Sequence, residues 1–233
     1  MQEALLLDTV QKYISANFVL CVCVASLSAT CNRIVFTKSD ILDPHIREAL
    51  VGGRSGLHDG RNGELVVHEL GLAHAKRRVD VAVIDDEFHG YEIKSERDTL
   101  DRLKGQLHIF SQALHKLTLV VATKHLESIH ETVPAWCGIT EVRPDSIGRI
   151  NLNKVQEAKR NPEFDPYIFA HLLWRNEAQS ILSQISSDPS VPRGSRTILY
   201  KLIVENTSDD QLTGIIKKAL ERRNNWRDHL PLP

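Results

Sequence analysis

Residues 64–95 read ELVVHELGLAHAKRRVDVAVIDDEFHGYEIKS. Within this stretch, residues 64–72, 78–84 and 88–95 are rich in valine and isoleucine and are separated by short polar segments. Short apolar runs bounded by polar turns are typical of consecutive β-strands. The stretch therefore predicts three adjacent strands, which form the centre of the expected fold.

The second and third of these strands are predicted to form a hairpin. If Asp85-Asp86-Glu87 is its three-residue loop, Ile84 faces Phe88, and the same register sets Asp80 opposite Glu92. A register that differs by two residues keeps Asp80 on this face of the sheet, whereas one that differs by a single residue turns it to the other face.

Charged side chains of this hairpin are expected to gather on one face. Glu92 and Lys94 are two residues apart on a strand, so their side chains project in the same direction. With Asp80 opposite, two carboxylates and an ammonium group meet in one patch. The other face is then expected to pack through Val79, Val81 and Val83.

Helices and further strands are predicted around the hairpin. Asp43-Pro44 begins a helix, because Asp can cap the first turn and Pro suits its first position. Residues 98–115 carry one apolar stripe at helical spacing and predict a second helix. Residues 117–122 predict a strand buried beside a parallel neighbour, followed by a short helix at 124–132 and a strand at 138–142.

This order of elements predicts an α/β fold with a mixed central sheet flanked by helices. Downstream, residues 166–185, 195–204 and 211–223 predict three helices with no strand between them. We therefore expect an N-terminal extension at residues 1–40, a core at 41–145 and a mainly helical accessory region at 146–233.

Composition places the chain among ordinary globular proteins. Of its 233 residues, 42% are hydrophobic and 25% are charged. The formal net charge of −1 creates no global positive field that would attract nucleic acid, which leaves only a local basic face for that purpose. The 4 cysteines form no Cys-x-x-Cys pair, which favours reduced thiols in the cytoplasm over disulfides or zinc.

An apolar run at residues 18–25 is either the core of a signal peptide or a packed N-terminal element. Glu3 and Asp8 precede it with Lys12 as the one nearby cation, whereas a signal peptide needs clear positive charge. The run is also far shorter than the roughly 20 residues that span a bilayer. We therefore expect no membrane segment here.

The patch formed by Asp80, Glu92 and Lys94 suits phosphodiester hydrolysis. Two carboxylates with open coordination positions suit Mg²⁺, which keeps several waters. The metal can lower the pKa of a bound water and neutralise charge that develops on a phosphate. Lys94 would orient that water or stabilise the phosphorane.

A second match to the same spacing lies downstream, where Pro144-Asp145 precedes Glu157-Ala158-Lys159 by twelve residues. Residues 153–161 around it are polar and have little strand propensity. The alternating strand around Glu92 is therefore the better site.

Arg78-Val79-Asp80 and Glu92-Ile93-Lys94 resemble the motif of the PD-(D/E)XK nuclease superfamily, with Val79 in place of the usual proline. The string from Gly90 to Ser95, with Asp98-Thr99-Leu100 and Arg102-Leu103, is similar to a small and poorly characterised bacterial and phage branch. Leu173-Trp174-Arg175-Asn176-Glu177-Ala178 is similar to the same branch. The resemblance covers about residues 41–180.

This resemblance implies a restriction-endonuclease-like core and a metal-dependent nuclease. Asp80 and Glu92 would bind Mg²⁺, for which Mn²⁺ could substitute, and Lys94 would assist the attacking water. Gln106 matches a helix position that approaches the site, although it also suits the polar flank of a helix. Glu69 matches an acidic position that either completes the metal shell or holds Lys94, and Glu48 competes for that accessory role.

Further residues have two interpretations. Asp98 follows the motif closely, as does Ser95, but a cap on the next helix explains Asp98 equally well. Four cations near the C-terminus form either a phosphate-contacting helix edge or a solvated helix face. These cations are Lys217, Lys218, Arg222 and Arg223.

The leading hypothesis is a Mg²⁺-dependent nuclease acting on DNA, with no membrane partner. The alternative is a nuclease-fold module that binds nucleic acid or a protein without cutting, for which the near-neutral charge gives mild support. A hydrolase of small phosphoesters is disfavoured, because no glycine-rich phosphate loop lines up with the carboxylates.

Overall fold

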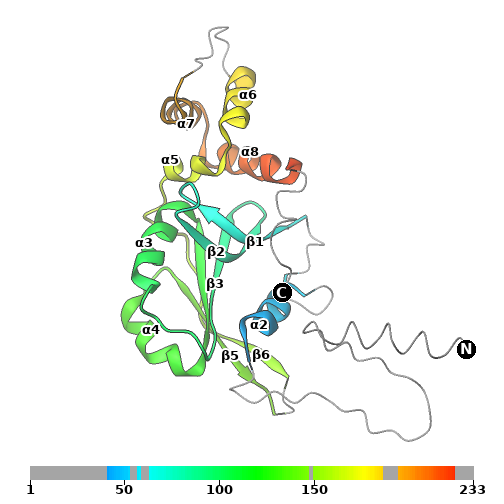
Figure 1. Ribbon diagram of the computed structural model, residues 1–233, viewed down its shortest axis with the longest axis vertical. Helices are drawn as coiled ribbons and strands as arrows, with labels where there is room; N and C mark the ends of the chain where they lie inside the picture. The colour runs from blue at the N-terminus through cyan, green and yellow to red at the C-terminus, as the bar shows by residue number, and fades with distance from the viewer. Residues whose placement is uncertain (1–40, 53–56, 59–62, 147–148, 186–193, 224–233) are drawn as a thin grey trace, which may run out of the picture. The chain divides into compact units, whose positions relative to one another are not determined.

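The computed structural model describes residues 41–52, 57–58, 63–146, 149–185 and 194–223 (Figure 1). The predictions made for residues 1–40, including Cys21, Cys23 and Cys31, lie outside these described residues. The remaining cysteine, Cys137, is buried and is not in a disulfide. Among the described helices, none combines the length and the apolar character needed to cross a membrane.

A six-stranded sheet forms the centre of the fold. Its strands, in sheet order, are β1 (Leu65–Leu72), β2 (Arg77–Ile84), β3 (Phe88–Lys94), β4 (Lys116–Ala122), β5 (Gly138–Pro144) and β6 (Ile150–Gln156). The pairs β3–β4 and β4–β5 are parallel, and the other neighbouring pairs are antiparallel. The predicted α/β class with a mixed sheet is therefore confirmed.

Helices cover both faces of this sheet. On one face, α2 (Asp43–Val51) packs Ile46 and Leu50 against Val81, Val83 and Tyr91. The opposite face is covered by α3 (Leu103–Ala113) and α4 (Leu126–Thr132), and Figure 1 shows these two on the far side of the sheet from α2.

The C-terminal part of the described chain is helical, as expected. Its helices are α5 (Pro166–Phe169), η4 (Ala170–Leu172), α6 (Arg175–Ile185), α7 (Arg196–Glu205) and α8 (Asp209–Arg222). The expected single helix at 166–185 is thus broken at residues 173–174. Buried Phe169, Leu199 and Ile216 belong to the same hydrophobic cluster as Phe110 of α3, so this region extends the core on the α3 face.

The predicted hairpin register between β2 and β3 is confirmed. Ile84 pairs with Phe88, and the same register continues to Val81 and Tyr91. The paired residues end there, one residue before Asp80 would face Glu92.

The expectation that three valines share one face of β2 is wrong. Val81 and Val83 pack on the α2 face, whereas Val79 is buried with Leu70 on the α3 face. The residue of β1 opposite this break is Glu69, whose φ of 52° lies in the left-handed region. A left-handed residue interrupts the alternation of a strand, so both strands change face at this level.

Several element boundaries also differ from expectation. Leu42, not Asp43, is the N-cap residue of α2, and α3 begins at Leu103 rather than at residue 98. The polar residues 153–156, which have little strand propensity, belong to β6. The sheet therefore continues beyond residue 145, where the core was expected to end.

Candidate active site

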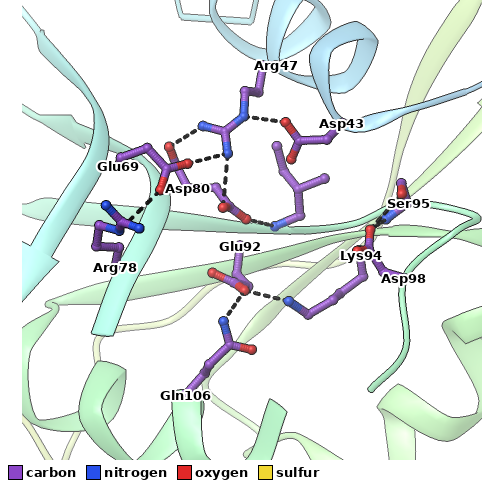
Figure 2. A network of polar contacts seen from close by, with 11 residues as sticks. Asp43, Arg47, Glu69, Arg78, Asp80, Glu92, Lys94, Ser95, Asp98 and Gln106 are labelled. Atoms are coloured by element: carbon purple, nitrogen blue, oxygen red, sulfur yellow. Dashed lines mark hydrogen bonds and ion pairs between the residues drawn. The ribbon is translucent and has the colours of Figure 1, made fainter. Parts of the chain in front are cut away.

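A cavity of about 670 Å³ is lined by the start of α2, by strands β1 to β3 and by the beginning of α3. Asp80, Glu92 and Lys94 all line it, as do Glu69 and Gln106. The structure therefore brings together the five residues that the sequence singled out for metal binding and hydrolysis (Figure 2).

Asp80 lies where β2 separates from β3. Beyond the last paired residues, Ile93 N–H donates to Asp80 Oδ2 at 2.7 Å. The carboxylate thus takes the place of a main-chain acceptor. The other oxygen, Oδ1, accepts from Arg47 Nη2 at 3.0 Å, so contacts from two different elements hold the side chain in one orientation.

Glu92 is held from two sides by donors. Lys94 Nζ and Gln106 Nε2 each donate to Glu92 Oε1 at 2.5 Å. The contact between Glu92 and Lys94 confirms that both side chains project from the same face of β3. Gln106 reaches the carboxylate from α3, so it lies inside the site rather than on an exposed helix flank.

The two carboxyl groups are difficult to ionise together. Burial raises the pKa of Asp80 to about 7, and the charge of Glu92 raises it as well, although Ile93 N–H and Arg47 oppose this. Burial also raises the pKa of Glu92, which is only 2% exposed, against the opposing effects of Lys94 and Gln106. A cation placed between such groups would favour their ionised forms.

Arg47 is a site residue that the sequence did not reveal. From α2 it donates through Nη1 to the main-chain oxygen of Asp80 at 2.6 Å and through Nη2 to Glu69 Oε1 at 2.6 Å. Its Nε contacts Asp43 Oδ1 at 2.5 Å, and its side chain is 10% exposed. Arg47 could have been identified only if the packing of α2 on the face of Val81 and Val83 had been known, because that packing brings Arg47 to Asp80.

Glu69 is the accessory carboxylate that reaches the cavity. Its ion pairs are with Arg47 and, at 3.6 Å, with Arg78 Nε, so of the two predicted roles the contact with Lys94 is not seen among the described residues. Its left-handed backbone places it at the level where β1 and β2 change face. Glu48, the competing candidate, is exposed and lies outside the cavity lining.

The loop after β3 is closed by Asp98, although not as a helix cap. Asp98 Oδ2 accepts from Ser95 N–H at 2.8 Å and from the Ser95 hydroxyl at 2.6 Å. Because α3 begins later, at Leu103, Asp98 instead fixes the backbone that directly follows Lys94.

The second match to the spacing does not form a site. Asp145 lies at the turn that joins β5 to β6, where its carboxylate accepts from Arg149 N–H. Glu157 follows the far end of β6 and pairs with Lys154 at 2.7 Å. The length of a seven-residue strand, about 20 Å, therefore separates the two carboxylates.

The four C-terminal cations do not line the cavity. Lys218 and Arg222 are exposed on α8, and Lys217 Nζ donates to Gly63 O at 2.8 Å. Arg223 forms two hydrogen bonds with Glu177 and stacks on Trp174 at 4.3 Å, so its guanidinium holds the helical region together.

The residues of the cavity suit one Mg²⁺ or Mn²⁺ ion bound largely by water and substrate. In the described chain, the buried atoms Glu92 Oε2 and Gln106 Oε1 have no hydrogen-bond partner. No three histidines, cysteines or carboxylates within that part of the chain converge as a complete metal shell. Mg²⁺ is commonly held by one or two carboxylates, which Asp80 and Glu92 supply.

Comparisons with known proteins point to a phage family. A family model described as "Bacteriophage P4 protein cII" matches residues 37–230. Protein cII of Enterobacteria phage P4 is 27% identical over 119 residues, which are 51% of this chain and 45% of that protein. The chain thus aligns with about half the length of this curated relative.

A solved structure, the SPO1766 protein of unknown function from Silicibacter pomeroyi, is 16% identical. The match covers 79% of this chain and 98% of that chain, with a TM-score of 0.35.

Proposed function

We propose that this chain, which belongs to the Bacteriophage P4 protein cII family, is a metal-dependent nuclease that hydrolyses phosphodiester bonds of DNA. The observation that carries the proposal is that Asp80, Glu92 and Lys94 line one cavity, in which Lys94 donates a hydrogen bond to Glu92. Action in the cytoplasm remains a prediction.

Asp80 and Glu92 would hold the metal. A bound Mg²⁺ or Mn²⁺ would supply a water of lowered pKa and would neutralise charge on the phosphate. Glu69 also lines the cavity and shares a hydrogen-bond donor, Arg47, with Asp80, so it is a further candidate ligand.

The chain's own residues supply orientation and charge. Arg47 and Ile93 N–H fix the direction of the Asp80 carboxylate. Gln106 does the same for Glu92 and leaves its own Oε1 unpaired inside the site, where it can accept from a water. Lys94 brings an ammonium group that can orient the attacking water or stabilise negative charge on the phosphate.

The proposal is tested by single-turnover cleavage of supercoiled plasmid, single-stranded DNA and RNA, each with Mg²⁺, Mn²⁺ or EDTA. We expect metal-dependent cleavage of DNA by the wild-type protein. Glu92→Gln and Lys94→Ala should each lower the rate by about 100-fold or more, because the first removes a proposed metal ligand and the second removes the group proposed to orient the attacking water. The matched changes Glu157→Gln and Lys159→Ala, in the second match, should leave the rate within about twofold.

Three results would contradict this assignment. Loss of activity in Glu157→Gln with activity retained in Lys94→Ala would place the chemistry elsewhere. Cleavage that persists in EDTA would contradict the metal-dependent mechanism. Absent cleavage by the wild-type protein, with DNA binding intact, would favour the non-cleaving module instead.

A further inference from the structure

Exposed cations surround the mouth of the cavity on two sides. Lys76 is the last residue of the turn between β1 and β2, and Arg77 and Arg78 begin β2. Arg97 and Arg102 lie between β3 and α3. All five side chains belong to exposed residues that line the cavity. In Figure 2, Arg78 lies on one side of the carboxylates, and Asp98, which is next to Arg97 in the chain, lies on the other.

The exposed cations of this cavity lie nearer the surface than its two deepest carboxylates, while the side chains of Glu69 and Asp43, which pair with Arg47, are 29% and 38% exposed. The side chains of Glu92 and Asp80 are 2% and 20% exposed, whereas that of Arg78 is 60% exposed. This arrangement does not suit a small free anion, because such an anion could reach the bottom of the cavity, where the carboxylates would repel it. It suits a long polyanion whose successive phosphates contact the mouth while one of them lies over the floor.

Four of the five cations are available to a ligand. Within the described chain, Arg78 pairs with Glu69, but Lys76, Arg77, Arg97 and Arg102 form no ion pair. The guanidinium of Arg77 extends toward the first turn of α3, since a Cβ added at Gly105 would lie 3.8 Å from its Nη2. The two groups of cations therefore approach each other across the cavity.

The turn that carries the first group has an unusual backbone. Ala73, His74 and Ala75 have φ values of 48°, 59° and 60°, although none is a glycine. Left-handed residues with a side chain cost about 1–2 kcal/mol each and concentrate at functional sites. The His74 ring stacks on His171 of η4 at 4.1 Å, so the helical region supports this turn.

We propose that Lys76, Arg77, Arg97 and Arg102 form a phosphate-docking rim that holds DNA across the cavity. The inference rests on the proposed function, because it takes the floor of the cavity as the place of hydrolysis. It assigns DNA binding to these loops and not to the cations of α8.

The test measures DNA affinity without cleavage. Fluorescence anisotropy of a labelled duplex of about 20 base pairs, recorded in EDTA over a range of salt concentrations, gives Kd and its salt dependence. We expect Arg77→Ala/Arg97→Ala to raise Kd by about tenfold and to reduce the salt slope by about 2, one unit for each lost phosphate contact. Circular dichroism confirms that the variant is folded.

Two charge-matched variants serve as comparisons. Lys154→Ala/Lys201→Ala removes two exposed cations far from the cavity and should leave Kd within about twofold. Lys218→Ala/Arg222→Ala removes the two exposed cations of α8 and should do the same. A greater loss in the α8 variant than in the rim variant would overturn the rim, as would wild-type affinity in the rim variant or no binding by the wild-type protein.

Binding and cleavage can fail separately. Rim-dependent binding by a protein that never cleaves DNA would support the rim and contradict the nuclease. Cleavage by a rim variant with unchanged Kd would contradict the rim and leave the nuclease intact.

Discussion

Asp80 combines opposing influences within a single side chain. Burial and Glu92 disfavour its negative charge, while Ile93 N–H and Arg47 favour it. The carboxyl group is therefore fixed in place before any ligand binds, yet burial and the charge of Glu92 raise its pKa and oppose its ionisation. A metal would find its ligand already oriented and would compete with a proton for it.

The raised pKa makes stability fall with rising pH. The ordinary pKa of the group is 3.8, so between that value and about 7 the folded protein holds a proton that the unfolded chain has lost. Unfolding free energy therefore decreases through this window and levels off above it. Asp80→Asn removes the titration and keeps one acceptor oxygen, which can replace the contact with Ile93 N–H or the contact with Arg47 Nη2 but not both. We expect its thermal midpoint to match that of the wild type at about pH 4 and to exceed it at about pH 8 by roughly 2–4 °C for each kcal/mol removed.

The same thermal melts, repeated with Mg²⁺, test metal binding by Asp80. Mg²⁺ should raise the thermal midpoint of the wild type at high pH, since a ligand that binds only the folded state stabilises it. It should leave the midpoint of Asp80→Asn unchanged, because this variant lacks the proposed metal ligand. Asp86→Asn, at an exposed carboxylate of the β2–β3 loop, should behave like the wild type. An Asp80→Asn advantage that is equal at all pH values, or an equal Mg²⁺ shift, would refute the assignment.

At the scale of single elements, the turn between β1 and β2 is the most strained segment described. Ala75 has a φ of 60° and is exposed, so glycine at this position would relieve the backbone without opening a cavity. We expect Ala75→Gly to raise the free energy of unfolding by about 0.5–1 kcal/mol, the left-handed cost less the entropy of the added glycine.

The same chemical change in a helix should have the opposite sign. Ala49→Gly in α2 should lower the free energy of unfolding by about 1 kcal/mol, because glycine is a poor helix former. Urea denaturation of both variants gives the two values. A destabilised Ala75→Gly would show that the alanine side chain stabilises the turn more than its backbone conformation costs.

Element identity could be predicted from the sequence where side chains alternate or repeat regularly. The β2–β3 register followed from a loop of three residues, and it holds as far as Val81 and Tyr91, which are next to Asp80 and Glu92 in the chain. In contrast, β6 is an edge strand with no fully buried residue, and its apolar alternation ends at Leu152, so the polar residues that follow were not recognised as strand.

Contacts between distant elements could not be predicted in this way. Arg47 enters the site because α2 crosses the sheet at one particular place, which no local pattern encodes. Glu69 has a left-handed backbone, although glutamate has no preference for that conformation. Because this conformation could not be predicted, the change of face at Val79 could not be predicted either.

At the scale of the whole molecule, the C-terminal helices and the part that contains the sheet share one core. Their contact near the cavity is the stacked pair of His74 and His171, around which Tyr167 and Tyr200 also pack. Burial lowers the pKa of His171 to about 4, and the positive potential of His74 and Lys76 lowers it further, although Asp165 opposes this. Burial also lowers the pKa of His74, as does Arg196. Protonation of this pair would therefore weaken the junction between the two parts.

Acid should loosen the molecule at this junction. The pKa of His171 falls from an ordinary 6.5 to about 4, so the unfolded chain takes up a proton first and stability is lost as pH decreases through that range. His171→Phe keeps a ring in the stack and removes the titration. We expect it to lose less unfolding free energy than the wild type between about pH 6.5 and pH 4.5, as measured by urea denaturation.

The contribution of Asp80, which has the opposite sign, is present in both proteins and cancels in the difference. His130→Phe, at an exposed histidine of α4, serves as the control and should follow the wild-type pH dependence. If His171→Phe and the wild type lost the same free energy of unfolding on acidification, the stacked pair would be excluded as the source of that loss.

The hydrogen bond from Ile93 to Asp80 gives the molecule a built-in spectroscopic probe. The amide of Ile93 donates to a side-chain oxygen instead of a strand partner, so its proton senses the charge on that carboxylate directly. In a nitrogen–proton correlation spectrum, the Ile93 cross-peak would trace the titration of Asp80, and Mg²⁺ would displace it without any substrate present. Its exchange with deuterated water would report how firmly the two diverging strands are held at the point where hydrolysis is proposed to occur.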